Sequence, residues 1–124
     1  MTKKILIIDD DVSLATIMSH FIQDKGFTVE TAFDAYAGVG TAISFRPDLI
    51  LLDLQMPAGG GAAVCLRISQ NNILNKTPII FITSSDEKEL KKQLPIVAQA
   101  KGYFKKPIDM DALMAAIGQV LGPT

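Results

Sequence analysis

Leu49-Ile50-Leu51-Leu52-Asp53 is the stretch of sequence that decides the fold. Its four apolar residues follow one another without polar alternation and end at a carboxylate. Two further runs have the same form, residues 5–8 before Asp9 and residues 79–82 before Thr83. Short continuous runs of branched apolar residues predict strands that are buried on both faces, as in a parallel sheet covered by helices.

Weaker strand signals and helical segments lie around these three runs. Residues 28–32 alternate in polarity, which is typical of an edge strand, and residues 102–104 indicate a short fifth strand. Apolar spacing of three and four predicts five helices. The first contains Leu14, Ile17, Met18, Phe21 and Ile22 and is closed by Gly26, and the others cover residues 35–45, 62–70, roughly 86–94 and 110–121. Strict alternation of strand and helix predicts an α/β fold with right-handed crossovers.

Composition narrows the class of protein. The chain has 124 residues, 48% hydrophobic and 20% charged, which predicts one globular domain over residues 1–124. Twelve basic and 13 acidic residues give a net charge of -1, which argues against a general affinity for nucleic acid. The lone Cys65 forms no internal disulfide, and no apolar stretch approaches the roughly 20 residues of a membrane span. We therefore expect a cytoplasmic protein with no membrane partner.

Polar residues follow the predicted strands at their carboxyl ends. Asp9-Asp10-Asp11 follow the first strand, Asp53 the third, Thr83-Ser84 the fourth and Lys106-Pro107 the fifth. Open α/β sheets bind their ligands outside the carboxyl ends of the strands. The sequence therefore predicts a functional site at this edge of the sheet.

These segments resemble the receiver domains of two-component response regulators, including those of the chemotaxis type. The resemblance rests on residues 7–11, on residues 52–57 with Gly61, on residues 82–84 and on residues 102–107, and it covers essentially the whole chain. It implies a flavodoxin-like, doubly wound (βα)5 fold whose five-stranded parallel sheet has the order 2-1-3-4-5. It also implies that residues 1–124 are one receiver domain.

The resemblance implies a magnesium site. Asp53 would be the phosphoacceptor, and Asp9, Asp10, Asp53 and the backbone carbonyl of Gln55 would hold Mg2+. In the implied strand order the first and third strands are neighbours, so the three carboxylates converge. Carboxylates packed closely repel one another, and a hard cation bound by oxygen ligands relieves that repulsion.

The resemblance also implies a phosphorylation switch. A sensor histidine kinase or a phosphotransfer protein would supply the phosphoryl group, and Thr83 and Lys106 would bind its oxygens. Thr83 and Tyr103 would then change the surface formed by the fourth helix, the fifth strand and the fifth helix. An output protein or domain, or a phosphorylation-dependent dimer, would recognise that surface. Such a protein catalyses only its own phosphorylation and dephosphorylation.

Several residues have simpler interpretations. Asp11 is interpreted as the N-cap of the first helix, and Asp109 as that of the last. Residues 59–61 are interpreted as a flexible lead into the third helix, because no Lys-Ser/Thr follows as a phosphate-binding loop requires. Six of the 12 basic residues lie between positions 86 and 106, either as a solvated face or as a contact for an acidic partner or a second copy.

Two other functions are considered. Haloacid-dehalogenase-type phosphotransferases share a strand-end Asp, but they place an acid where this chain has Gln55, and their nucleophile follows an early strand. A receiver-fold scaffold that binds partners independently of phosphorylation is the alternative function.

The chain also departs from the usual receiver pattern. Pro95 is predicted to end the fourth helix near Leu94, since proline breaks helices. Gln55 and Ser85 are hypothesised to set the lifetime of the phosphate.

Overall fold

A computed structural model describes residues 2–57, 60–84, 88 and 99–122. Its strands are β1 (Lys4–Ile8), β2 (Thr28–Ala32), β3 (Leu49–Asp53), β4 (Ile79–Thr83) and β5 (Ala100–Lys105). All pair in parallel in the order β2-β1-β3-β4-β5, which confirms the predicted sheet. This order places the ends of β1 and β3 side by side.

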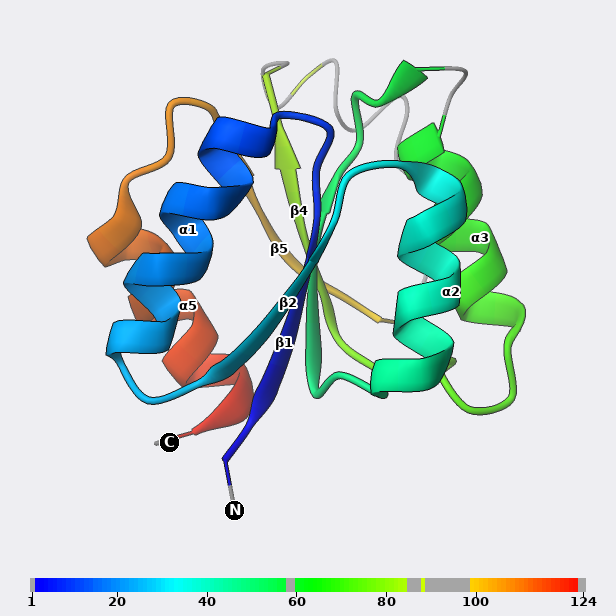
Figure 1. The fold of residues 1–124 in the computed structure, drawn as a ribbon, viewed down its shortest axis with the longest axis horizontal. Coiled ribbons are helices and arrows are strands. Elements are labelled where there is room, and N and C mark those ends of the chain that lie inside the picture. Colours follow the sequence, from blue (N-terminus) through cyan, green and yellow to red (C-terminus); the bar gives the residue numbers. More distant parts are fainter. Residues whose placement is uncertain (1, 58–59, 85–87, 89–98, 123–124) are drawn as a thin grey trace.

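The described helices are α1 (Val12–Asp24), α2 (Ala35–Phe45), α3 (Gly60–Gln70) and α5 (Met110–Leu121). Helices α1 and α5 cover one face of the sheet, and α2 and α3 cover the other (Figure 1). The predicted fourth helix lies outside the described residues apart from Lys88, and so do Ser85 and the predicted break at Pro95. No helix in the described part of the chain is long and apolar enough to cross a membrane.

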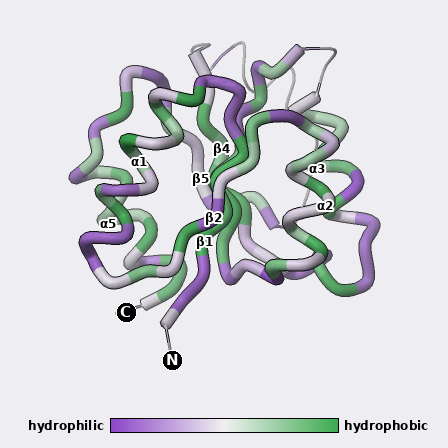
Figure 2. The backbone as a smooth tube through the Cα atoms, in the orientation of Figure 1, coloured by the Kyte–Doolittle hydropathy of each residue, from purple (hydrophilic) through white to green (hydrophobic). Residues whose placement is uncertain are grey.

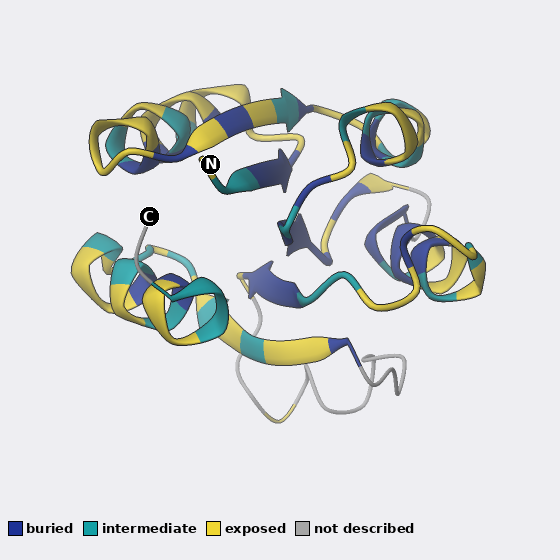
Figure 3. Ribbon diagram, turned by 90° about the horizontal axis from the view of Figure 1, so that it is seen from below, coloured by how far each residue is buried: buried dark blue, intermediate teal, exposed yellow. Residues whose placement is uncertain are grey.

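The core explains why the strand sequences do not alternate in polarity. In β1, Ile5 and Ile7 pack in the cluster beneath α1 and α5, whereas Leu6 and Ile8 pack in the cluster beneath α2 and α3. Both faces of β1, β3 and β4 are therefore buried, as the apolar centre of Figure 2 and the dark strands of Figure 3 show. Burial on two sides holds the strand ends, and the side chains that follow them, in fixed positions.

The helix ends follow the predicted chemistry. Asp11 accepts a hydrogen bond from the Leu14 amide at 3.0 Å, and Asp109 accepts one from the Ala112 amide at 3.1 Å. Both carboxylates are N-caps, as predicted. Gly26 has a φ of 100° and follows the end of α1, where a left-handed residue closes a helix.

The structure corrects details of the sequence interpretation. Helical spacing predicts Ile17 on the apolar stripe of α1, but Ile17 is 61% exposed, and Ala15 is buried in the core instead. Strand β5 is longer than residues 102–104. Exposed lysines at both of its ends, which are typical of edge strands, masked its extent in the sequence.

Candidate functional site

The carboxylates of Asp9, Asp10 and Asp53 meet at the carboxyl ends of β1 and β3. Each of the three offers an oxygen within 4.8 Å of the others. Asp9 and Asp53 are each only 1% exposed, whereas Asp10 is open to solvent. The register between β1 and β3 pairs Ile8 with Leu52, so the residues that follow this pair, Asp9 and Asp53, lie at the same level of the sheet. The predicted convergence of the three acids is confirmed.

Lys106, which directly follows the edge strand β5, brings a positive charge to this acidic cluster. Its Nζ lies 3.1 Å from Asp9 Oδ2 and 3.4 Å from Asp53 Oδ2. Its backbone amide donates to the Thr83 carbonyl at 2.7 Å, which ties the end of β5 to the end of β4. The Lys106–Pro107 peptide bond is cis. The two distances from Nζ show that one ammonium contacts two buried carboxylates, so the three acids of the cluster outnumber its one lysine.

Asp9 retains binding capacity toward a cation. Its Oδ1 accepts hydrogen bonds from the Asp11 amide at 2.9 Å and from Lys106 Nζ at 3.3 Å. Its Oδ2 is buried and accepts no hydrogen bond from the described residues, although Lys106 Nζ lies close enough for an ion pair. A buried carboxylate oxygen without a hydrogen-bond donor is costly unless a cation lies beside it, so Asp9 Oδ2 relies on Lys106 and has room for a metal ion as a second cationic partner. The donor set, made of oxygens only, fits Mg2+.

Burial changes the protonation of Asp53. Desolvation raises its pKa from 3.8 to about 6; the Gln55 amide and Lys106 oppose this rise, and the charge of Asp9 adds to it. Burial alone would lower the pKa of the Lys106 ammonium, but the carboxylates of Asp9 and Asp53 outweigh it and raise that pKa. Burial therefore favours the protonated form of Asp53, whereas Lys106 and the Gln55 amide favour the carboxylate that a nucleophile requires.

Gln55 connects the ends of β3 and β4 through two groups. Its backbone amide donates to Asp53 Oδ1 at 2.9 Å. Its side-chain Oε1 accepts from the Ser84 amide at 2.7 Å and also from the Ser84 hydroxyl. The sequence predicts a metal-binding role for the Gln55 backbone carbonyl and an influence of Gln55 on the phosphate lifetime, but it does not predict this side-chain bridge, because no motif encodes it.

The two predicted switch residues lie on neighbouring strands. Thr83 ends β4 and is 1% exposed, whereas Tyr103 on the edge strand β5 is 38% exposed. Tyr103 pairs in register with Phe81, and Thr83 pairs with Lys105. The partly exposed tyrosine is therefore two positions along the ladder from the position opposite the buried threonine.

Gly61, in the first turn of α3, packs against the backbone at the end of β3. A Cβ at this position would lie 2.4 Å from the Asp53 carbonyl oxygen and 2.4 Å from Leu54 Cα. The interpretation of residues 59–61 as a flexible lead is wrong for Gly60 and Gly61, which belong to α3 and are buried. Gly61 allows the start of the helix to pack directly on the backbone that carries Asp53.

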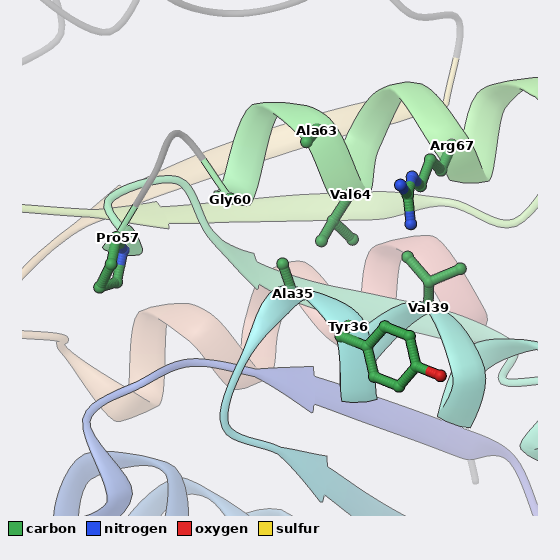
Figure 4. A pocket seen from close by; sticks show the side chains of 8 residues that line it. All are labelled: Ala35, Tyr36, Val39, Pro57, Gly60, Ala63, Val64 and Arg67. Atoms are coloured by element: carbon green, nitrogen blue, oxygen red, sulfur yellow. The ribbon is translucent and has the colours of Figure 1, made fainter.

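Two hollows flank this edge of the molecule. One, of about 490 Å³, adjoins Lys106 and is lined by residues of α1 and of the segment leading into α5, namely Asp11, Leu14, Ile17, Lys106, Pro107, Ile108 and Met110. The other, of about 250 Å³, lies between α2 and α3, with Tyr36 and Arg67 at its margin (Figure 4). Only the first shares a residue with the acidic cluster and its lysine.

A family model for the response regulator receiver domain matches residues 5–118. The chain belongs to the response regulator receiver domain family. Receiver domains are parts of two-component regulators, so this receiver domain is a signal-transduction module rather than a classical enzyme.

Individual relatives agree with this assignment. The alkaline phosphatase synthesis transcriptional regulatory protein PhoP of Bacillus subtilis is 33% identical over 98% of this chain and 49% of its own length. The DNA-binding dual master transcriptional regulator RpaA of Synechocystis is 31% identical over 98% of this chain and 50% of its own. The receiver domain thus spans about half the length of these curated relatives.

A solved structure shows the same architecture over the full length. The chemotaxis response regulator CheY4 of Vibrio cholerae is 30% identical, covers 98% of this chain and 100% of its own, and has a TM-score of 0.88. The flavodoxin-like fold that the sequence predicted is confirmed.

Proposed function

We propose that this receiver domain is a phosphorelay switch that accepts a phosphoryl group on Asp53 with the help of Mg2+. The observation that carries the proposal is the position of the Asp53 carboxylate. It is buried, lies within 4.8 Å of oxygens of Asp9 and Asp10, and has Lys106 Nζ at 3.4 Å. A nucleophile beside both a candidate cation site and a fixed lysine is suited to phosphoryl transfer.

The transfer is a displacement at phosphorus. A carboxylate oxygen of Asp53 forms a bond to the phosphorus of a phosphohistidine, the phosphorus–nitrogen bond breaks, and its electrons stay on the imidazole, which takes up a proton. The Gln55 amide, bonded to Asp53 Oδ1, holds the carboxylate in one orientation. The product is an acyl phosphate, which water hydrolyses, so the switch resets.

Asp9, Asp10, Asp53 and the Gln55 carbonyl are the groups that would hold the metal. When bound, Mg2+ would neutralise charge on the phosphoryl oxygens and relieve the repulsion among the three carboxylates. Lys106 would pair with another phosphoryl oxygen, and the Thr83 hydroxyl would donate to a third. Each of these residues stands at the end of a strand, so the sheet sets their separation.

Switching follows from Thr83 and Tyr103. Tyr103 on β5 is 38% exposed in this structure. If the Thr83 hydroxyl moves toward a phosphoryl oxygen, space opens beside β5 and the Tyr103 ring turns inward to fill it. The surface that includes β5 and α5 then changes shape, and an output protein, an output domain or a second copy of the chain recognises it.

The protein that donates the phosphoryl group would bind at the hollow beside Lys106, which is called the groove below. The apolar side chains of Leu14, Ile17, Ile108 and Met110 line this groove next to the charged site. A sensor histidine kinase or phosphotransfer protein must place its phosphohistidine at Asp53, so its own apolar surface would cover these residues.

We also propose that residues 1–124 form a single receiver domain.

Intact mass tests the proposal. The protein is incubated with Mg2+ and acetyl phosphate, beside Asp53→Asn and beside Asp24→Asn, which removes an exposed carboxylate at the end of α1. We expect the wild type and Asp24→Asn to gain one phosphoryl group, and neither Asp53→Asn nor a chelated sample to gain any. An unchanged wild type would instead support the scaffold function.

A further inference from the structure

Ser84 directs two donors at one oxygen. Its backbone amide donates to Gln55 Oε1 at 2.7 Å, and its hydroxyl donates to the same atom. Ser84 directly follows Thr83, the last residue of β4. Two converging donors at the end of a strand make a local site for an acceptor oxygen, and here a side chain of the same protein fills it.

The sheet explains why these donors face the acidic cluster. In a parallel ladder, alternate residues of one strand point their amide and carbonyl groups to the same neighbouring strand. The Ile82 carbonyl accepts from the Leu54 amide at 3.0 Å, so the Ser84 amide also points toward the β3 side. Strand β3 ends at Asp53, and the Ser84 amide donates to a side-chain oxygen of Gln55 rather than to a carbonyl of β3. The Gln55 side chain supplies the missing acceptor.

Gln55, which forms the bridge to Ser84, is also hydrogen-bonded to the proposed phosphoacceptor Asp53. Gln55 binds Asp53 Oδ1 through its amide and holds the Ser84 donors through its side chain. A phosphoryl group on Asp53 would place charged oxygens next to this same peptide. Hydrogen bonds to a charged acceptor are roughly twice as strong as bonds to a neutral amide. A phosphoryl oxygen would thus compete with Gln55 Oε1 for the Ser84 donors.

We propose that the Gln55 side chain is an internal latch that occupies the Ser84 amide and hydroxyl in the unphosphorylated domain and yields them to a phosphoryl oxygen. This inference rests on the proposed phosphorylation of Asp53. The latch holds the end of β4 in the resting position, and its release accompanies phosphorylation. Hydrolysis of the acyl phosphate lets Gln55 take the donors back. Gln55 is therefore a positioning residue that opposes phosphoryl binding through its side chain.

The test uses Gln55→Met, which keeps the length of the side chain and removes the acceptor oxygen. The control is Gln23→Met, which makes the same exchange on the exposed side of α1. The probe is beryllofluoride with Mg2+, which mimics a phosphoryl group on a carboxylate. Two readouts are taken, the amide proton shift and exchange rate of Ser84 by NMR, and the apparent affinity for beryllofluoride.

We expect Gln55→Met to speed exchange of the Ser84 amide proton before the probe is added. We also expect it to tighten beryllofluoride binding by about three- to tenfold, the effect of one released hydrogen bond. Gln23→Met should change neither readout. A merely structural bridge predicts faster exchange with unchanged or weaker binding, and that result would overturn the latch.

The controls separate the latch from the function on which it rests. If acetyl phosphate phosphorylates the wild type and Gln55→Met binds beryllofluoride no better, the latch is wrong and the phosphorelay proposal stands. If the wild type accepts neither reagent, both fail. Gln55→Ala, which also lacks the acceptor oxygen, serves as the second variant if Gln55→Met folds poorly, and the same gain in affinity is expected of it.

Discussion

Lys106 Nζ lies 3.1 Å from Asp9 Oδ2, across 97 positions of the sequence. The same ammonium lies 3.4 Å from Asp53 Oδ2, so a single lysine balances two buried carboxylates. Burying an unpaired carboxylate is energetically unfavourable, and the ion pairs with Lys106 offset that cost for Asp9 and Asp53. It leads to predictions about stability as well as about phosphorylation.

Replacing Lys106 should destabilise the metal-free protein. Lys106→Ala leaves the Asp9 and Asp53 carboxylates buried without their cation, and we expect a loss of about 1–3 kcal/mol in the free energy of unfolding. Urea denaturation with chelator present measures it, and Lys105→Ala, at an exposed neighbour, is the control. Added Mg2+ should recover part of the loss. An equal effect of the two variants would show that Lys106 does not balance the buried charge.

Asp53→Asn should stabilise the protein at neutral pH. Because the folded-state pKa is raised from 3.8 to about 6, the native state keeps the Asp53 proton while the unfolded chain loses it, and stability falls as pH rises through this window. Removing the carboxylate should raise the free energy of unfolding by about 1–3 kcal/mol near neutral pH and leave it nearly unchanged below the unfolded pKa of 3.8. Thermal unfolding against pH, without metal, checks this. A gain of the same size at both ends of the range would rule out the burial of this charge as its cause.

Gly61→Ala should disturb the backbone that carries Asp53. The added methyl group would lie 2.4 Å from the Asp53 carbonyl oxygen and from Leu54 Cα, so the chain must shift, and we expect a loss of about 1–3 kcal/mol of stability. Gly40→Ala is a matched control at an exposed position of α2, where a Cβ would meet no described atom within 4 Å. That control should gain about 0.5–1 kcal/mol. If Gly61→Ala were as harmless as Gly40→Ala in urea denaturation, the close packing of α3 on β3 would be refuted.

Ile17→Glu should separate the two routes of phosphorylation. Ile17 is 61% exposed and lines the groove beside Lys106, so a charge there should slow transfer from a phosphohistidine-bearing partner by about tenfold or more. Acetyl phosphate needs no such surface and should react at the wild-type rate. Ile43→Glu, on the exposed side of α2, is the control and should change neither rate. Slower transfer in Ile43→Glu, with Ile17→Glu unaffected, would move the partner to the other face.

The fold and the cluster of charged side chains were predictable because the apolar runs mark the strands and the charged residues come directly after them. Buried, uninterrupted runs marked β1, β3 and β4, and a parallel sheet brings the residues after such runs to one edge. The strand order that the resemblance implies then places Asp9, Asp53 and Lys106 together. The positions of their side chains toward one another follow from the register.

Other features depend on contacts that no local pattern encodes. The bond from Ser84 to Gln55 joins residues 29 positions apart and arises because β3 ends where β4 still needs an acceptor. The packing of Gly61 depends on how closely α3 approaches Leu54. The exposure of Ile17 arises because Ala15, Met18 and Ile22 already fill the contact of α1 with the sheet. Helical spacing identifies a face only to within its edge positions.

The most direct test of the central claim is to locate the phosphoryl group. The protein is phosphorylated with acetyl phosphate and Mg2+ and then treated with sodium borohydride, which reduces an acyl phosphate to an alcohol and releases phosphate. Peptide mass spectrometry then finds the reduced residue. We predict homoserine at position 53 and unchanged aspartates at positions 9 and 10. Reduction at Asp9 or Asp10, or at no residue, would contradict the assignment of Asp53 as the phosphoacceptor.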